Sequence, residues 1–386
     1  MTFRSTFAHT EALQYRLRAA GALLGVTDNT MRGYADNAGI PVKRASDLKP
    51  GSPSVRIFDT DTLFRIAQWR RAQGYVKGPT NGPTIVTVDV IKGGTGKTTT
   101  SVELSLHLQF LGLRVLLIDL DIQANATQLM GYEPDLTAEE APTYGLLPEA
   151  IIQETFASIL LPFLESKNRG NGAVNLRSAS IVEPVKKPFG EHGPHLIPAD
   201  TFLGDVESAL ANAKGQRELY IRQLIVASIQ GKVPNFSAGA YDIIIFDCPP
   251  SVSFTSTAAL AAADFVVAPI RLDAFSVKGL AKLMSEINAL ERDYHVKPEL
   301  VILPTHYAPQ LARIGRMQMQ LSQSHEFLAP NVISASEEFP KSLDQYLPLS
   351  LQKPTGNATK EYKLFAEHMH AKILTKAAEK SRKGAV

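Results

Sequence analysis

Residues 90–99 place glycines, lysines and threonines in an order that suits the binding of phosphate groups. Glycines let backbone N–H groups turn toward an anion, and a helix that begins directly after them adds its positive N-terminal end. Lys97 would reach the outer phosphates of a nucleotide, and the Thr98 hydroxyl would bind Mg²⁺. The chemistry that these residue types suit is phosphoryl transfer from a nucleotide. A glycine-rich turn without a ligand is the alternative.

Three aspartates are candidates for the same site. Asp119 and Asp121 follow the apolar run 115–118, and Asp247 follows the run 243–246. The carboxyl ends of parallel strands lie at one edge of a sheet, where ligands bind. Asp247 is therefore predicted to hold Mg²⁺ through water.

Alternating strands and helices must position these residues. Short, nearly continuous apolar runs are typical of strands buried on both faces, and the leucine spacing predicts a helix over 102–111. The sequence therefore predicts an α/β fold, a doubly wound and mostly parallel sheet like that of P-loop NTPases. Region 133–195 is interpreted as an insertion of helices and loops. The predicted strands are 84–90, 115–118, 243–246, 265–268 and 300–303.

Three motifs resemble those of one ATPase family. Residues 92–98 have the sequence KGGTGKT, which is similar to the deviant Walker A motif K-G-G-x-G-K-[ST] of the ParA/MinD superfamily. Residues 116–127 resemble the family's motif LLIDLDPQGNAT, with Ile122 in place of proline and Ala124 in place of glycine. Residues 241–251 resemble the Walker B strand and its D-x-P-P turn, so the motifs follow the family's order.

The resemblance implies roles for individual residues, with ATP and Mg²⁺ as cofactors. Lys92 corresponds to the signature lysine, which crosses a dimer interface to the partner's nucleotide, and it would act in catalysis beside Lys97. Asp121 would orient or activate the attacking water, with Asp119 as a second candidate. The residues expected to contact the nucleotide are Gly93, Gly94, Thr95, Gly96, Lys97, Thr98 and Thr99.

The same resemblance implies an ATPase that moves plasmids or chromosomes apart. It would form a homodimer on ATP, bind DNA and be stimulated by a centromere-binding partner of the ParB type. Three alternatives are a MinD-like positioning ATPase on a membrane, a nucleotide-regulated repressor, and a reductase- or transport-type relative. A basic N-terminal region argues against the first, and the intact set of Lys97, Asp121 and Asp247 argues against the second. The single cysteine argues against the third.

A Gly- and Pro-rich linker at 78–83 divides the chain into an N-terminal domain, 1–77, and an ATPase domain, 84–386. Residues 1–80 hold 12 basic and 6 acidic side chains, a net charge of +6, and the remainder carries −4. A basic region on a slightly acidic body suggests a polyanionic partner. A solvated basic surface without a partner is the alternative.

The N-terminal domain is predicted to be a winged helix-turn-helix with its turn at Gly25 and a wing strand near 54–58. Residues 18–70 resemble the winged helix-turn-helix of MerR type and the N-terminal region of type Ia ParA proteins. It would bind operator DNA and could repress its own operon. A helical dimerisation module without DNA contact is the alternative. The candidate DNA contacts are Thr30, Arg32, Tyr34, Lys43 and Arg44.

In the C-terminal third, Arg313, Arg316 and Lys341 fall where relatives place non-specific DNA contacts. Residues 357–383 predict a final helix with one apolar face. Packing of this helix on the core is preferred to membrane binding, and a membrane is not expected as a partner.

The chain has 386 residues and one cysteine, Cys248. This count excludes an internal disulfide framework and a multi-cysteine metal site, and it fits a reducing compartment. The apolar surroundings of Cys248 predict an inert thiol. We find no signal-peptide pattern and no apolar run of membrane-spanning length. The expected location is the cytoplasm, in association with the nucleoid.

Overall fold

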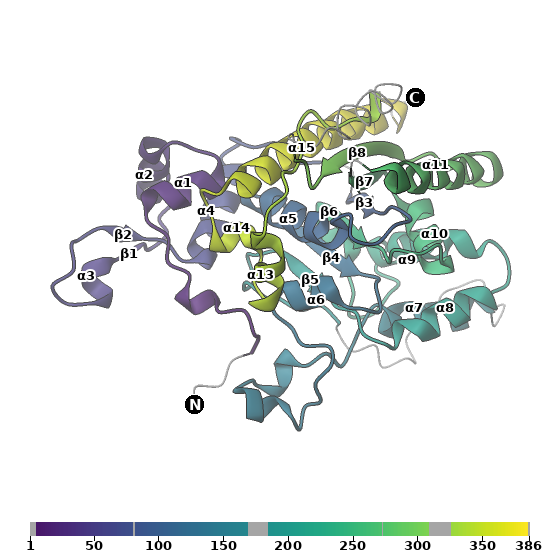
Figure 1. The fold of residues 1–386 in the computed structure, drawn as a ribbon, viewed down its shortest axis with the longest axis horizontal. Coiled ribbons are helices and arrows are strands. Elements are labelled where there is room, and N and C mark those ends of the chain that lie inside the picture. The colour runs from purple at the N-terminus through teal and green to yellow at the C-terminus, as the bar shows by residue number, and fades with distance from the viewer. Residues whose placement is uncertain (1–4, 80–81, 169–183, 272, 309–325, 385–386) are drawn as a thin grey trace.

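The computed structural model describes residues 5–79, 82–168, 184–271, 273–308 and 326–384. In this part of the chain, six parallel strands form a central sheet in the order β5-β4-β6-β3-β7-β8 (Figure 1). Because parallel neighbours need crossover connections, the chain winds over both faces of the sheet. The strands are β3 (Thr84–Val88), β4 (Val115–Asp119), β5 (His195–Ile197), β6 (Ile243–Asp247), β7 (Phe265–Arg271) and β8 (Glu299–Thr305).

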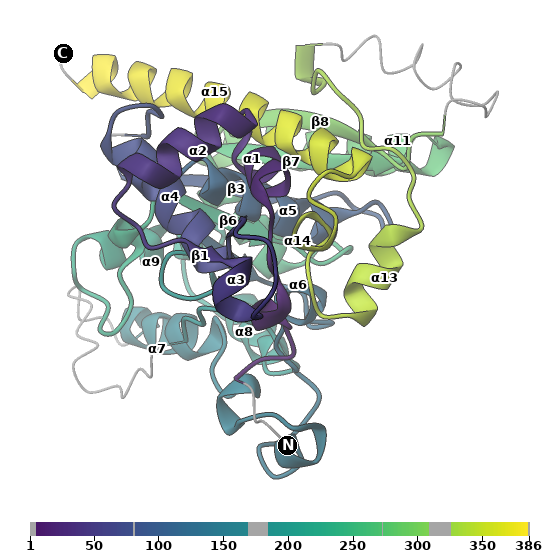
Figure 2. The same ribbon diagram turned by 90° about the vertical axis from the view of Figure 1, so that its left-hand side faces the viewer.

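Helices cover both faces of this sheet (Figures 1 and 2). One face is covered by α5 (Lys97–Phe110) and α15 (Asn357–Gly384), which share an apolar core with β3. Two further apolar clusters fill the opposite face. The helices on that face are α7 (Ala157–Asn168), α8 (Leu203–Ala211), α9 (Tyr220–Ile229), α10 (Phe254–Ala262) and α11 (Ala274–Tyr294).

The structure confirms all five predicted strands, with ends that differ by at most three residues, and it confirms the doubly wound parallel sheet. Strand β5 was not predicted. It has three residues between Pro194 and Pro198, too few to show a pattern, and it lies next to β4. Helix α7 lies in region 133–195, which agrees with the interpretation of that region as helices and loops.

Two helices with a tight turn lie near the start of the N-terminal head, residues 5–77, on the left of Figure 1. Helix α1 (Leu17–Leu24) ends at Gly25, whose φ of +69° is a conformation that glycine adopts without strain. Helix α2 (Asp28–Asn37) begins after Thr27, whose hydroxyl accepts a hydrogen bond from the backbone N–H of Thr30 at 3.2 Å. Two helices joined by a short turn at Gly25 therefore lie where the sequence predicted them, and their assignment as a winged helix-turn-helix stays a prediction.

A short antiparallel ribbon and two further helices complete the head. Strand β1 (Lys43–Arg44) pairs with β2 (Arg56–Ile57), and α3 (Ala45–Leu48) lies between them in the chain. Helix α4 (Thr60–Ala72) follows. The ribbon occupies the position in the chain that the sequence predicted for a wing.

The head packs against the body, the residues from Thr84 onward, through one continuous apolar core. Figure 2 shows α1, α2 and α4 in front of the sheet, beside α15. The ring of Phe64 on α4 stacks on that of Phe110 on α5, with centroids 4.8 Å apart. After α5, Gly112 has a φ of +87°, and a Cβ there would lie 2.4 Å from the carbonyl oxygen of Ala67. Only glycine leaves room for α4 at this point.

An ion-pair network reinforces this contact. The carboxylate of Asp242, just before β6, pairs with Arg71 of α4 and with Arg114. Burial alone would raise the pKa of Asp242, but hydrogen bonds from the two guanidinium groups hold it below its usual value. The head is thus joined to the start of the sheet by charge as well as by apolar contact.

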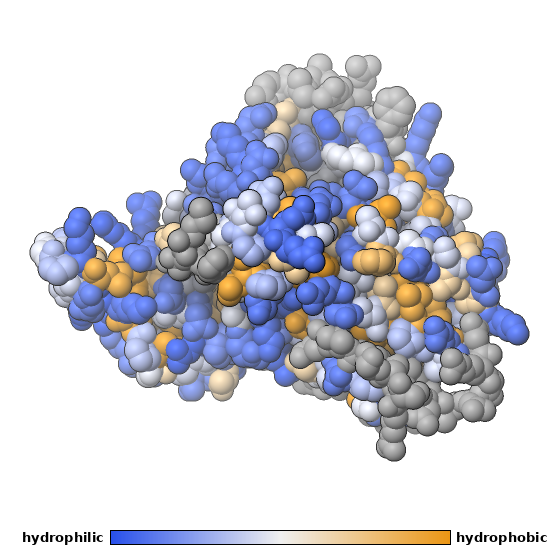
Figure 3. Space-filling view, turned by 90° about the horizontal axis from the view of Figure 1, so that it is seen from below, coloured by the Kyte–Doolittle hydropathy of each residue, from blue (hydrophilic) through white to orange (hydrophobic). Residues whose placement is uncertain are grey.

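The C-terminal helix α15 packs on the core, as the sequence predicted. Two of its lysines form ion pairs with the body: Lys372 with Glu299 and Lys380 with Asp264. Across the residues that the structure describes, no helix is long and apolar enough to cross a membrane. On the face seen from below in Figure 1, apolar patches lie between hydrophilic residues (Figure 3). The buried apolar face of α15 comprises Tyr362, Phe365, Met369 and Ile373.

The shared core predicts the effect of removing one ring. Phe64→Ala is expected to lower the free energy of unfolding by about 3–5 kcal/mol, because the fully buried ring leaves a cavity beside Phe110. Head and body are expected to unfold in one transition. Urea unfolding, followed by the fluorescence of Trp69, the single tryptophan, and by circular dichroism of the whole chain, measures both effects.

The matched control for this substitution is Phe202→Ala. That ring is 65% exposed, so its removal is expected to change stability by less than about 0.5 kcal/mol. A tryptophan transition at clearly lower urea concentration than the loss of circular dichroism would contradict the shared core.

Candidate nucleotide-binding site

The glycine-rich loop joins β3 to α5 and has the strand–loop–helix context that the sequence predicted. Gly94 and Gly96 have φ values of +68° and +88°, which let successive backbone N–H groups point to one side. Gly96 directly precedes the first residue of α5. A Cβ at Gly93 or Gly94 would meet nothing within 4 Å, so the loop borders open space on that side.

Lys97 lies inside the loop rather than in solvent. It is 7% exposed, and its ammonium group donates hydrogen bonds to the carbonyl oxygens of Val90 at 3.2 Å and Lys92 at 2.8 Å. Burial lowers the pKa of Lys97, while the charges of Asp89 and Asp247 oppose that change. A buried cation is therefore already present where a phosphate group would enter.

Asp247 ends β6 beside the start of α5. Its Oδ1 accepts a hydrogen bond from the Ser101 hydroxyl at 2.8 Å, whereas its buried Oδ2 has no hydrogen-bond partner among the described residues. Burial raises the pKa of Asp247, and the hydroxyls of Ser101 and Thr98 oppose the rise. A buried carboxylate oxygen without a partner beside a threonine hydroxyl suits a hydrated divalent cation.

Asp119 has a different environment. It is fully buried and accepts hydrogen bonds from the backbone N–H of Asp121 at 3.1 Å and from the backbone N–H and hydroxyl of Thr127, both at 2.9 Å. Burial and the nearby charge of Asp247 raise its pKa. These bonds fix the loop between β4 and α6 (Asn125–Leu129). The geometry lends no support to a catalytic role for Asp119.

Asp121 lines the cavity above the loop, and its Oδ1 accepts a hydrogen bond from the backbone N–H of Gln123 at 3.0 Å. The two residues that depart from the family motif, Ile122 and Ala124, lie just after Asp121 in the chain. Ile122 is 50% exposed, and Ala124 has a φ of +52°, in the left-handed region that favours glycine. The loop therefore keeps a glycine-like backbone at Ala124 in spite of the alanine.

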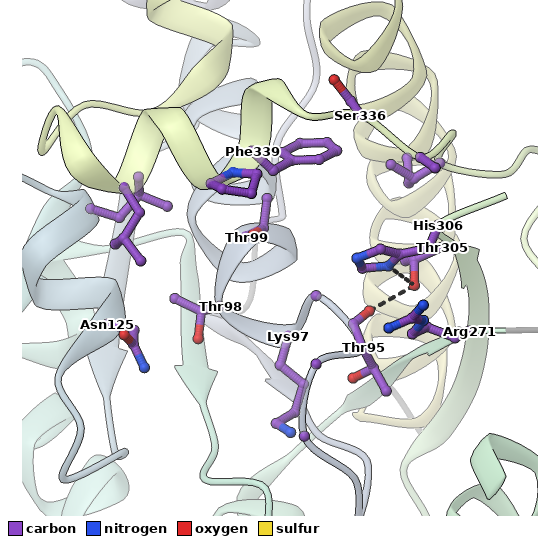
Figure 4. Close-up of a pocket in the computed structure, with 18 of the residues that line it drawn as sticks. Thr95, Lys97, Thr98, Thr99, Asn125, Arg271, Thr305, His306, Ser336 and Phe339 are labelled. Atoms are coloured by element: carbon purple, nitrogen blue, oxygen red, sulfur yellow. Dashed lines mark hydrogen bonds between the residues drawn. The ribbon is translucent and has the colours of Figure 1, made fainter. Parts of the chain in front are cut away.

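The cavity has a volume of about 610 Å³, within the usual range for small-molecule sites. Figure 4 shows Lys97 and Phe339 at opposite ends, with Arg271 and His306 along one side. The Thr305 hydroxyl donates to the carbonyl oxygen of Thr95 at 2.7 Å and so connects β8 to the loop. The sequence did not predict the wall residues Arg271, Thr305, His306 and Phe339, because no local motif marks them. Further lining residues are Thr98, Asp121, Asn125, Ile333, Ser336 and Leu343.

Lys92 is paired within its own chain. Its ammonium group lies 2.7 and 2.9 Å from the two carboxylate oxygens of Asp273, which directly precedes α11. Both side chains are about one quarter exposed. The resemblance assigns Lys92 to the nucleotide site of a partner protomer. In this protomer the Lys92 ammonium group instead contacts Asp273 of its own chain.

The three candidate DNA contacts on α2 do not share one face. Residues two positions apart on a helix point about 200° apart, so Arg32 is turned away from Thr30 and Tyr34. Arg32 is exposed. The Tyr34 ring packs against Trp69 and Tyr75, with centroid distances of 5.5 and 5.6 Å. Tyr34 thus has packing contacts within the head, and DNA contact by Thr30, Arg32 and Tyr34 stays a prediction.

Of the other candidates, Lys43 and Arg44 are exposed on β1. The Arg44 guanidinium donates to the carbonyl oxygen of Ser54 at 3.1 Å and so stabilises the ribbon. Lys341 is exposed and pairs with Glu338 at 3.3 Å. The remaining two candidates, Arg313 and Arg316, lie outside the described residues.

Comparison with known proteins adds independent findings. Residues 83–302 match the AAA domain family. Cell division protein PomZ of Myxococcus xanthus is 25% identical over 295 residues, which cover 76% of this chain and 80% of PomZ. The chromosome-partitioning ATPase Soj of Thermus thermophilus is 28% identical over 291 residues, which cover 73% of this chain and 93% of Soj.

Solved structures agree on the fold. A partition protein superposes with a TM-score of 0.60 at 17% identity over 95% of this chain and 93% of its own. Cobyrinic acid a,c-diamide synthase from Mycobacterium smegmatis, with bound ATP analog and magnesium, gives 0.53 at 23% identity over 74% of this chain and 93% of its own. Both similarities support the predicted P-loop NTPase-like fold.

Proposed function

The chain belongs to the ParA/MinD superfamily of partition ATPases, and on this premise we propose that it hydrolyses ATP with Mg²⁺ to separate copies of a plasmid or chromosome. One arrangement carries the proposal: Lys97, Thr98 and Asp121 line a single cavity of about 610 Å³ above a glycine-rich loop. The ATP analog and magnesium bound by the Mycobacterium smegmatis enzyme support the choice of cofactors.

The residues present fit these cofactors. Thr98 and Asp247 would hold Mg²⁺, which would neutralise charge on the phosphates, and the unpartnered Oδ2 of Asp247 is suited to that task. The Lys97 ammonium would leave two carbonyl oxygens for phosphate oxygens. Asp121 would accept a hydrogen bond from the attacking water and orient it. Phe339, at the far end of the cavity, would cover the base.

The first test separates binding from turnover. Lys97→Ala is expected to abolish ATP binding, because the phosphates lose their main cation. Asp121→Ala is expected to bind ATP within a fewfold of wild type but to hydrolyse it about 100-fold more slowly, because the water is no longer oriented. Fluorescence titration and phosphate release measure the two steps. Asp135→Ala removes an exposed carboxylate elsewhere and serves as the control; unchanged turnover in Asp121→Ala would refute its role.

The proposal includes an ATP-dependent homodimer in which Lys92 acts on the nucleotide of the partner. In the isolated protomer, Asp273 satisfies the Lys92 ammonium with two short contacts. In the dimer, the lysine would exchange this carboxylate for a phosphate. A charge-assisted hydrogen bond contributes about 1.5–3 kcal/mol, and twofold symmetry forms the contact twice. Asp273 and the partner's nucleotide would therefore compete for one ammonium group.

Two substitutions test this competition in opposite directions. Lys92→Ala is expected to bind ATP but to weaken dimerisation by about two orders of magnitude or more. Asp273→Asn is expected to strengthen dimerisation about tenfold, because Lys92 loses its local anion. Sedimentation velocity with Mg²⁺ and a slowly hydrolysed ATP analogue measures both. Lys297→Ala, which removes a surface ion pair with Glu291, is the control. Wild-type dimerisation by Lys92→Ala would show that the lysine does not act across the interface.

We further propose that the head binds DNA, that the ATP-bound dimer binds DNA without sequence preference, and that a ParB-type partner stimulates hydrolysis. The exposed cations Arg32 and Lys43 on the head support DNA contact. On this reading the protein works in the cytoplasm on nucleoid DNA and also represses its own operon. Lys341 remains a candidate contact on the body.

The DNA proposal predicts a change in salt dependence. The double variant Arg32→Ala, Lys43→Ala is expected to bind DNA more weakly and to lower the slope of log affinity against log salt concentration by about 2, because two phosphate contacts are lost. Fluorescence anisotropy with labelled duplexes between about 50 and 200 mM salt measures the slope. Arg292→Ala, Lys297→Ala removes two exposed cations from the body and is the matched control. An equal effect of both variants would argue against the head.

A further inference from the structure

Two short helices border the part of the cavity that was assigned above to the base of the nucleotide. Helix α13 (Glu338–Asp344) contributes Phe339 and Leu343 to the lining, and α6 contributes Leu129. Phe339 and Leu343 pack against the apolar cluster that contains Leu129. Figure 4 shows Phe339 at this end. The spacing between α6 and α13 therefore decides how much room the base has.

The start of the head crosses from one of these helices to the other. The backbone N–H of Phe7 donates to the carbonyl oxygen of Gly131, the second residue after α6, at 2.6 Å. The Phe7 ring stacks on that of Tyr346, the second residue after α13, with centroids 4.4 Å apart. Residues 6–8, which we call the strap, thus bridge the ends of α6 and α13.

The strap fits closely against the end of α6. Gly131 has a φ of +95°, and a Cβ there would lie 2.5 Å from the Cβ of Ala8. Ala8 is buried, and Phe7 packs against the small apolar cluster within residues 141–151. The strap is therefore seated in the body on both sides, although it belongs to the head.

Tyr346 is held in an unfavourable backbone conformation at the end of α13. Its φ is +49°, in the left-handed region that residues with a Cβ rarely adopt. Its backbone N–H donates to the carbonyl oxygen of Leu343 at 3.0 Å, and its hydroxyl donates to Oε2 of Glu133 at 2.7 Å. Because Leu343 lines the cavity, the stacking of Phe7 on Tyr346 acts directly on the position of the cavity wall.

We propose that Phe7 is a positioning residue of the nucleotide site: through Gly131 and Tyr346 it holds α6 and α13 at the spacing that receives the base, and so it sets the affinity for the nucleotide. The inference rests on the proposed function, since the cavity must bind a nucleotide for this spacing to matter. Phe7 itself does not line the cavity. The head therefore acts on nucleotide binding in its own chain, in addition to the DNA contact proposed above.

This arrangement separates affinity from chemistry. Without the stacked ring, a smaller fraction of the molecules has the wall in place, and the apparent affinity falls by that fraction. ATP and ADP share the base, so both are expected to bind more weakly by the same factor. Lys97 and Asp121 lie at the phosphate end, so the rate of the chemical step with ATP bound is expected to change little.

The experiment compares wild type with Phe7→Leu, which loses the stacked ring but keeps an apolar side chain. Titration calorimetry with Mg²⁺ and either ADP or a slowly hydrolysed ATP analogue is expected to show about fivefold weaker binding of both, within the range that a stacked aromatic pair contributes. The single-turnover rate at saturating ATP is expected to stay within about twofold. Tyr75→Leu removes a 62% exposed ring elsewhere in the head and is the control, expected to bind as wild type does.

A double-variant cycle tests whether Phe7 acts through Tyr346. If the two rings act as one unit, Phe7→Leu combined with Tyr346→Leu should bind the nucleotide no more weakly than Tyr346→Leu alone. Independent effects would multiply instead. Circular dichroism of each variant checks that it is folded.

Hydrogen exchange gives a second measurement that does not depend on turnover. In the nucleotide-free protein, Phe7→Leu is expected to speed exchange in segments 125–131 and 338–347 more than elsewhere in the chain. Coupling between two sites is reciprocal, so ADP with Mg²⁺ is expected to slow exchange of the Phe7 amide in wild type.

The outcomes separate the two proposals. Wild-type protein that binds neither nucleotide would overturn the proposed function and this inference with it. Wild-type protein that binds, together with a Phe7→Leu variant of equal affinity and equal exchange, would overturn the role of Phe7 alone. So would a variant that loses affinity and single-turnover rate together and exchanges faster throughout the chain, because that pattern is a general loss of structure. Weaker binding of both nucleotides at an unchanged rate, with a non-additive double variant, would establish the role.

Discussion

The ammonium group of Lys97 is buried, and a buried charge must be matched by nearby opposite charge and hydrogen bonds. In this fold the match comes from strands that are distant in sequence. The loop that carries Lys97 follows β3, and β6 places Asp247 opposite Val88 of β3. Strand β4 then places Asp119 opposite Asp247. The order β4-β6-β3 brings these ends together at one edge, so the crossover topology meets the electrostatic requirement of the loop.

The sequence was informative where the relevant contacts are local. The loop, the aspartate at the end of β6 and the strands around them follow from short patterns of glycine, lysine and apolar residues. The sequence could not show that Lys92 pairs with Asp273, which is 181 positions away. It also could not show that the Asp119 carboxylate accepts a hydrogen bond from the backbone N–H of Thr127. Such contacts depend on how distant segments meet, and no spacing rule encodes them.

The surroundings of Tyr34 show a second limit of the sequence. Residues at alternate positions of α2 point to nearly opposite sides of the helix, so Arg32 and Tyr34 do not lie on one face. The aromatic neighbours Trp69 and Tyr75 come from α4 and the segment after it. Helix periodicity shows this from the sequence, whereas the packing of Tyr34 against these rings required the tertiary structure.

Helix α5 connects the glycine-rich loop to the contact between the body and the head. Its first residue is Lys97 in the loop, and its last, Phe110, stacks on Phe64 of the head. The close approach of Ala67 to Gly112, the second residue after this helix, has an evolutionary consequence. A head of this kind cannot be replaced by an unrelated domain, because α4 of the head fits against the body only where Gly112 has no side chain. Recombination between relatives would yield stable hybrids only where both partners keep that glycine, so head and body are expected to be inherited as one unit.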